Sequence, residues 1–184
     1  MGGICPSSYI PQTRGLRFHF FGTLTPVLLQ GWENASMIAV VQRVTRASVT
    51  VEDPPYSASI NNGLCVLLGI EDGDDGADAN WMAKKLAHLR VFKDDQDKMN
   101  LSLSDNGGEL LLISQFTLVG DCSQGNRPSF IRAASPEIAE PLVNEVGNLL
   151  YQKYSIPVTL GKFGAIMLIE LVNDGPVTVV IHRE

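Results

Sequence analysis

The chain of 184 residues is short of cysteine, of long apolar runs and of the common catalytic motifs. Its three cysteines are widely spaced and form no Cys-x-x-Cys pair, which argues against a disulfide framework or a structural zinc site and favours a reducing compartment. No apolar run approaches the roughly 18 residues that cross a bilayer, so we expect no membrane association. GxSxG, GxGxxG after a strand, the P-loop and HExxH are all missing, which excludes the simplest hydrolase, nucleotide-binding and zinc-protease assignments.

The charge balance is acidic, with 14 basic and 20 acidic side chains and a net charge of −6. Proteins that coat nucleic acid through bulk electrostatics are usually basic, so we expect no DNA partner. Binding one end of an RNA in a local pocket stays open. The apolar fraction of 45% and the charged fraction of 18% are typical of a globular domain, and the length allows one domain with a tail.

The first 36 residues differ from the rest, because they carry two arginines, one acid and no lasting period of 2 or 3.6. Three interpretations compete: a disordered extension ahead of an internal start at Met37, an organellar transit peptide, or a myristoylated anchor. The anchor fits poorly, since Pro6 stands where serine or threonine is expected. We therefore divide the chain into an extension over 1–36, disordered or targeting, and a folded domain over 37–184.

Seven strands and two helices are expected after Met37. Serine at 135 followed by Pro136 is a helix start signal, whereas Pro141 predicts a later start or a bend. Because strands and helices do not alternate, we predict an α+β fold with a small, barrel-like, mostly antiparallel sheet and two covering helices. The strands are expected at 38–44, 47–51, 64–70, 109–119, 157–160, 165–172 and 177–182, and the helices from 72–76 to 89 and after 135–137.

Two segments are chemically unusual for their setting. Residues 114–118 (Ser-Gln-Phe-Thr-Leu) place polar groups inside an apolar strand, where period 2 puts Gln115 and Thr117 on one face. Residues 173–178 (Asn-Asp-Gly-Pro-Val-Thr) put glycine before proline. Simpler alternatives exist for both: a strand that turns toward solvent, and an ordinary hairpin turn between the last two strands.

Other candidate sites are weaker. The acidic run 72–78 lacks the spacing and final glutamate of a calcium loop, and fits a solvated helix N-terminus. His88 and His182 have no telling serine or cysteine nearby, although a triad could still assemble in space. We therefore predict no metal and no cofactor.

The two unusual segments together resemble the paired signature of D-aminoacyl-tRNA deacylases. Five further stretches are similar to the same family, and the likeness runs from Met37 to about Ile181. These stretches are 39–44 (Ala-Val-Val-Gln-Arg-Val), 47–49 (Ala-Ser-Val), 98–100 (Lys-Met-Asn), 127–130 (Arg-Pro-Ser-Phe) and 161–165 (Gly-Lys-Phe-Gly-Ala).

The resemblance implies a cytoplasmic homodimer that binds the acceptor end of aminoacyl-tRNA and hydrolyses the ester to a D-amino acid, releasing free D-amino acid and tRNA. It implies that Gly175–Pro176 is a cis peptide bond that reaches into the partner's site and rejects L-aminoacyl esters. Such a steric gate admits glycine, so glycyl-tRNA mischarged on tRNA(Ala) is a further expected substrate. The 2′-hydroxyl of the tRNA is expected to take part in catalysis without a protein nucleophile.

The resemblance also assigns residues to roles. Backbone N–H groups around Phe116 and Thr117 are candidate oxyanion donors, whereas the Thr117 hydroxyl, without a neighbouring base, is a weak nucleophile. Phe163 is expected to pack on the terminal adenine, and Arg43 to brace the Gly-Pro loop. The expected catalytic segment is Ser114, Gln115, Phe116 and Thr117; the gate is Gly175, Pro176, Val177, Thr178, Asn173 and Arg43; the adenosine pocket is Phe163, Gly164, Ala165 and Met167.

Three positions depart from the family pattern. Ile166 replaces an acid, Glu170 a small polar residue and Leu160 a threonine, all toward the adenosine end of the expected pocket. The alternative function is a catalytically silent module of the same fold that binds nucleic acid or protein. It predicts tRNA binding without turnover.

Overall fold

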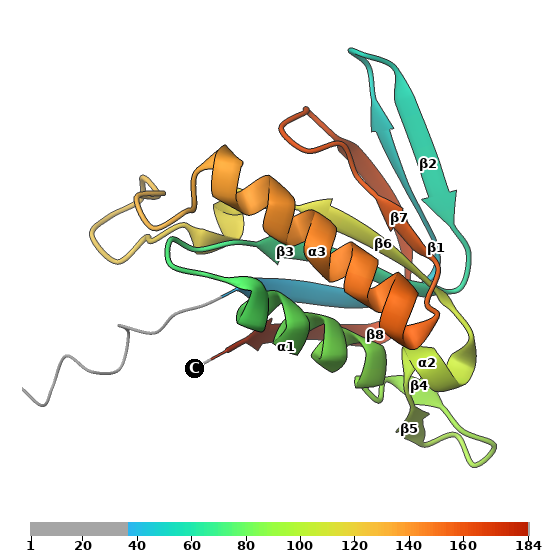
Figure 1. Cartoon of the computed structure of the whole chain (residues 1–184). Coiled ribbons are helices and arrows are strands. Elements are labelled where there is room, and N and C mark those ends of the chain that lie inside the picture. The colour runs from blue at the N-terminus through green and yellow to red at the C-terminus, as the bar shows by residue number, and fades with distance from the viewer. Residues whose placement is uncertain (1–36, 184) are drawn as a thin grey trace, which may run out of the picture. The chain divides into compact units, whose positions relative to one another are not determined.

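The computed structural model describes residues 37–183, shown in Figure 1. The predictions made for residues 1–36 lie outside the described part of the chain. The elements are β1 (Ile38–Val51), β2 (Tyr56–Ile60), β3 (Gly63–Gly69), α1 (Gly76–His88), β4 (Phe92–Lys93), β5 (Met99–Leu101), α2 (Leu103–Asn106), β6 (Glu109–Ser114), the 3-10 helix η1 (Phe116–Val119), α3 (Pro136–Tyr154), β7 (Val158–Leu160) and β8 (Leu168–His182).

The main sheet is strongly curved and runs in the order β2-β1-β3-β6-β7, with β8 on the other edge of β1. The Tyr56 hydroxyl of β2 donates to the carbonyl of Leu160 in β7 at 2.6 Å. This hydrogen bond joins the first and last strands of that order. The α+β, barrel-like fold agrees with the prediction. The sheet is mixed: the three β1 pairings are antiparallel, whereas β3–β6 and β6–β7 are parallel.

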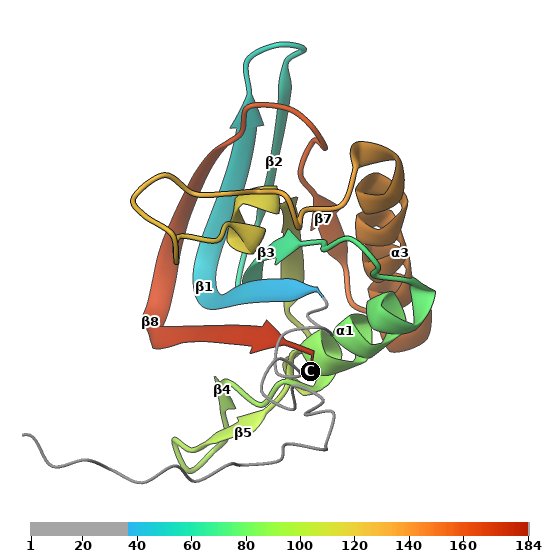
Figure 2. The same cartoon turned by 90° about the vertical axis from the view of Figure 1, so that its left-hand side faces the viewer.

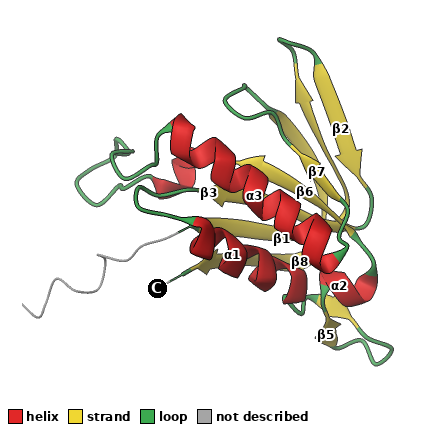
Figure 3. Cartoon of the chain, in the orientation of Figure 1, coloured by secondary structure: helices red, strands yellow, loops and turns green. Residues whose placement is uncertain are grey.

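Two layers of core hold the sheet. The larger cluster lies between the sheet and the helices α1 and α3, which Figure 3 shows on the same face. The smaller cluster fills the inside of the curve and includes Val49, Cys65 and Ile113. Strand β3 is apolar throughout because it contributes side chains to both clusters. Burial raises the pKa of the Cys65 thiol to about 11, so this cysteine is a packing residue.

The strand expected over 109–119 is too long. Strand β6 ends at Ser114, and the chain continues as the 3-10 turn η1. The pairing of β6 with β3 ends at the same residue, where Ser114 lies opposite Leu68. The predicted alternation of faces beyond Ser114 is therefore wrong.

The prediction of a turn at 173–176 is also wrong, because these residues lie inside the single strand β8. Strand β1, which pairs with β8, is also one continuous strand where two were predicted, at 38–44 and 47–51. Its pairing with β8 shifts register between Gln42 and Arg46. Figure 2 shows β1 and β8 bending together, so the chain turns a corner without reversing. Asn173 and its neighbours occupy that corner.

The two long helices lie close to where they are predicted. Helix α1 begins with a capping box in which Asp75 accepts from the backbone of Asp78 and the Asp78 side chain accepts in return. Helix α3 begins at Pro136 and runs through the exposed Pro141, against the expectation of a later start. The described residues also contain the short helix α2, the hairpin β4–β5 and strand β2, which the sequence did not predict. None of the described helices is both long and apolar enough to cross a membrane.

Candidate active site

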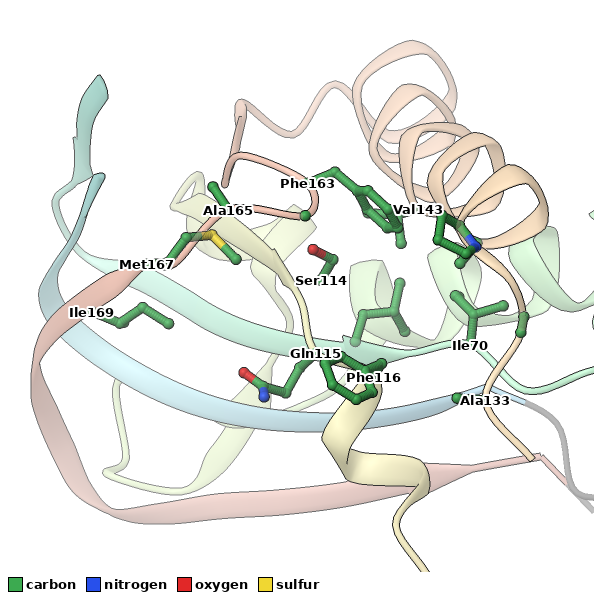
Figure 4. Close-up of a pocket in the computed structure, with 15 residues that line it drawn as sticks. Ile70, Ser114, Gln115, Phe116, Ala133, Val143, Phe163, Ala165, Met167 and Ile169 are labelled. Carbon is green, nitrogen blue, oxygen red and sulfur yellow. The ribbon is translucent and has the colours of Figure 1, made fainter. Parts of the chain in front are cut away.

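A cavity of about 530 Å³ opens where the parallel strands β3 and β6 end (Figure 4). The carboxyl ends of neighbouring parallel strands meet at one edge, which is where open α/β sheets commonly bind ligands. The rest of the wall comes from the loop after β7 and from the start of α3. The lining residues are Leu68, Ile70, Ser114, Gln115, Phe116, Ala133, Ala134, Pro136, Ala139, Val143, Phe163, Gly164, Ala165, Met167 and Ile169.

The predicted catalytic segment forms one side of this cavity. Ser114 is the last residue of β6, and the Gln115 N–H donates to the carbonyl of Leu68 at 2.7 Å. Gln115 Nε2 donates to the hydroxyl of Thr117, which is exposed and does not line the cavity. The N–H groups of Phe116 and Thr117 open the 3-10 turn, and neither donates to another described residue. These two N–H groups are available to a ligand.

The predicted adenosine residues form the opposite side. Figure 4 shows Phe163, Ala165 and Met167 across the cavity from Gln115 and Phe116. Gly164 has φ +71°, a conformation that favours glycine, so the loop can turn tightly after the half-buried Phe163 ring. The 2.6 Å contact of the Tyr56 hydroxyl with the Leu160 carbonyl anchors the start of this loop.

The predicted gate does not line the cavity of its own chain. Gly175 and Pro176 are exposed on β8, and their peptide bond is cis. Arg43, only 5% exposed, donates from Nε to the carbonyl of Asp174 at 3.0 Å and pairs with its carboxylate at 2.9 Å. The Arg43 guanidinium also donates to the carbonyl of Val91.

Asn173 ties the other side of the same corner. Its Nδ2 donates to the carbonyls of Arg43 at 3.2 Å and Val177 at 3.0 Å. Val177 is buried, whereas Thr178 is exposed and lies opposite Gln42 of β1. The residues on both sides of the Gly-Pro bond are therefore held by hydrogen bonds, while Gly175 and Pro176 themselves are exposed.

The residues that line the cavity include no titratable side chain. His88 packs edge-on against Tyr154 with ring centroids 5.2 Å apart, and His182 lies near the end of β8 opposite Ile38. No group of three or more His, Cys, Asp or Glu residues suited to a metal ion lies within residues 37–183. The arrangement can position a substrate and offer backbone donors, but its lining supplies no acid or base.

The sequence prediction missed one wall of the cavity. Ala133 and Ala134 precede α3, and Pro136, Ala139 and Val143 come from its first turns. The Arg-Pro-Ser-Phe stretch at 127–130 was the available signal, because it belongs to the segment that leads to this wall.

Comparison with known proteins identifies relatives over most of the chain. The family model described as D-Tyr-tRNA(Tyr) deacylase matches residues 40–182. The D-aminoacyl-tRNA deacylase of Halalkalibacterium halodurans is 50% identical over 148 residues, which are 80% of this chain and 100% of the relative. The enzyme of the same name from Natranaerobius thermophilus is 49% identical over 145 residues, 79% of this chain and 96% of the relative.

Two solved structures share the fold. A c-Myc DNA unwinding element binding protein superposes with a TM-score of 0.73 at 42% identity, covering 80% of this chain and 99% of the other. A probable eukaryotic D-amino acid tRNA deacylase superposes with a TM-score of 0.70 at 14% identity, covering 80% and 100%. The second likeness bears on the fold alone.

Proposed function

The chain belongs to the D-Tyr-tRNA(Tyr) deacylase family, and from this premise we propose that it hydrolyses the ester bond of D-aminoacyl-tRNA to release free D-amino acid and tRNA. One observation carries the proposal: Ser114, Gln115 and Phe116 line the same cavity as Phe163, although Phe116 and Phe163 are 47 positions apart in the chain. A cavity between a turn with open N–H groups and an aromatic ring suits an ester carried by a nucleoside.

The chemistry asks little of the side chains. An aminoacyl ester is an activated substrate, so holding it in place and stabilising the developing oxyanion supply much of the rate. The N–H groups of Phe116 and Thr117 are the oxyanion donors in this mechanism. The 2′-hydroxyl of the terminal ribose takes part in the reaction. Thr117 is not the nucleophile in this mechanism, because among the described residues its hydroxyl contacts only the Gln115 amide, which is not a base.

The terminal adenosine binds on the side of Phe163. An unstacked base gains about 1–3 kcal/mol from stacking on an aromatic ring. Gly164, Ala165 and Met167 shape the wall beside this ring. The acidic protein then needs to contact few phosphates, which fits a grip on the acceptor end alone.

The gate belongs to the partner subunit in a homodimer. Gly175 and Pro176 project from β8, an edge strand whose outer side also exposes Leu168 (57%) and Val180 (62%). An exposed apolar edge strand is a surface on which a second copy can pair. The Gly-Pro segment would then enter the partner's cavity and exclude an L-side chain by collision, which discriminates more strongly than attraction alone.

A gate that excludes only L-side chains admits glycine, so glycyl-tRNA mischarged on tRNA(Ala) is a second substrate. Residues 37–184 form the deacylase domain, consistent with a family match over 40–182. The protein acts in the cytoplasm, where aminoacyl-tRNA is used in translation.

A second candidate is nucleic-acid binding without turnover. The 42% identical neighbour is described as a c-Myc DNA unwinding element binding protein, and this description favours nucleic-acid binding as the alternative to hydrolysis. The acidic net charge disfavours it.

Single-turnover deacylation of matched D-tyrosyl-, L-tyrosyl- and glycyl-tRNA by the full chain, with EDTA present, tests the proposal. We expect fast loss of the D-ester and of the glycyl ester, with the L-ester untouched. Binding of tRNA or of single-stranded DNA without hydrolysis of any ester would replace the proposal by the second candidate.

A further inference from the structure

One wall of the cavity belongs to a segment with its own set of ties, residues 121–134, here called the strap. Its first part is a small hairpin in which Asp121 and Ser129 exchange two backbone hydrogen bonds of 2.8 and 2.9 Å. Its far end returns to the end of β3, where the Ala134 N–H donates to the Ile70 carbonyl at 3.1 Å. The strap therefore spans from the end of the 3-10 turn η1 to the start of α3.

An ion pair fixes the far end of the strap. Arg132 donates from one nitrogen to both carboxylate oxygens of Glu71 at 2.7 Å, and its carbonyl accepts from the Asp72 N–H at 2.9 Å. The Glu71 side chain is 4% exposed, and Arg132 is the only described residue that donates to its carboxylate. A buried carboxylate with a single cationic partner depends on that partner. Arg132 immediately precedes the lining residues Ala133 and Ala134.

An aromatic contact joins the strap to the turn that carries the predicted oxyanion donors. The rings of Phe130 and Phe116 meet edge to face, with centroids 5.3 Å apart. Phe130 also lies flush against the residue that closes the turn, because a Cβ added to Gly120 would stand 2.8 Å from the Phe130 ring. Phe130 thus contacts both ends of the turn.

We propose that the Arg132–Glu71 ion pair and Phe130 are positioning residues for hydrolysis: they hold the strap against the turn and so fix the Phe116 and Thr117 N–H groups at the ester. This inference rests on the proposed function. Neither Arg132 nor Phe130 is required to touch the substrate. A loosened strap leaves the Phe163 side of the cavity in place, so binding of the adenosine should survive while the chemical step slows.

The test compares Arg132→Met with Arg183→Met. Arg183 forms an ion pair with Asp78 of α1 and is exposed to a similar degree as Arg132, 37% against 41%, but lies outside the strap. We expect both variants to lose thermal stability. Only Arg132→Met should lower kcat for D-tyrosyl-tRNA, by about tenfold to a hundredfold, with KM within about twofold of wild type. Arg132→Lys should restore part of kcat, and Phe130→Leu should reproduce the kcat loss with the ion pair intact.

Hydrogen exchange of the peptide covering residues 114–120 gives a readout that does not depend on activity. Exchange should be faster in Arg132→Met than in wild type, and unchanged in Arg183→Met. Equal kcat values for Arg132→Met and the active wild type, or unchanged exchange in Arg132→Met, would overturn the inference. If wild type hydrolyses no ester, the proposed function fails, and the exchange result alone then decides whether the strap positions the turn.

Discussion

The cavity and the Gly-Pro corner differ in how complete each is within one chain. The cavity is assembled from β3, β6, the strap, α3 and the loop after β7, all from the same chain. Gly175 and Pro176 are flanked by residues that Arg43 and Asn173 hold, but they are themselves exposed and do not line the cavity. Under the proposed function, the chemistry would take place inside one subunit, whereas selection between D- and L-esters would be supplied by the other subunit.

Disturbing the corner should have the largest effect on selection. A Cβ on Gly175 would stand 2.1 Å from Asn173 Oδ1, so Gly175→Ala must displace the Asn173 side chain, whose two hydrogen bonds hold the corner. We expect the ratio of D-ester to L-ester hydrolysis to fall by about a hundredfold, because exclusion by collision is lost. Gly76→Ala is the control, since its Cβ would meet Glu145 Oε1 at an ordinary 3.4 Å. A Gly175→Ala ratio equal to that of Gly76→Ala would remove the corner from selection.

Disturbing the cavity should instead change affinity. Phe163→Ala removes the ring on which the adenine is proposed to stack, and we expect KM for D-tyrosyl-tRNA to rise by about tenfold to a hundredfold. The ratio of D- to L-ester hydrolysis should stay as in wild type. Phe163→Tyr keeps an aromatic face and should keep the wild-type KM. A changed D/L ratio in Phe163→Ala would mean that the two regions are not separate.

The Asp74 carboxyl, in the turn before α1, should make stability depend on pH. Burial raises the pKa of the Asp74 carboxyl from 3.8 to about 6, with the nearby Asp78 and Glu71 adding to the shift against backbone hydrogen bonds from Glu71 and Met37. The folded state therefore binds more protons than the unfolded state between these values, and stability falls as pH rises through about 4 to 6.

Denaturant unfolding of wild type and Asp74→Asn at several pH values measures this effect. Between pH 4 and pH 7 the wild type should lose at most about 3 kcal/mol of unfolding free energy relative to Asp74→Asn. Asp95→Asn, at an exposed position, should run parallel to wild type. A difference in unfolding free energy between wild type and Asp74→Asn that does not vary with pH would contradict the raised pKa of Asp74.

The smallest effects are expected from the side chains of a conventional hydrolase. Thr117→Val, His88→Ala and His182→Ala should each keep single-turnover rates within about tenfold of wild type, because none of these side chains lines the cavity. A loss of about a thousandfold or more in any of them would reinstate a protein nucleophile or triad.

The sequence predicted the parts whose signals are local. The apolar run of β3, the acidic start of α1 and the Ser135–Pro136 helix start all depend on neighbouring residues. The unusual stretch at 114–118 led to the cavity, but its strand assignment failed because the pairing of β6 with β3 ends at Ser114 and the chain continues as the 3-10 turn η1. The corner in β8 was predicted as a turn since its shape depends on the register shifts of β1.

The strap shows why the rest escaped prediction. Arg132 and Glu71 are 61 residues apart in the chain, and neither has a sequence context that marks it as one of a pair. The contact of Phe130 with Phe116 likewise exists only once the chain has folded back on β3. Such ties follow from tertiary packing, which periodicity and motif spacing do not encode.

Mixing two altered subunits tests most directly whether selection comes from the partner. Ala165→Trp fills the cavity and should hydrolyse neither ester, whereas Gly175→Ala should hydrolyse both. In mixed dimers an intact cavity from the second faces an intact corner from the first. With an excess of Ala165→Trp, the D/L ratio per active cavity should return toward that of wild type. A D/L ratio that stays at the Gly175→Ala value at every mixing ratio would contradict a gate supplied by the partner.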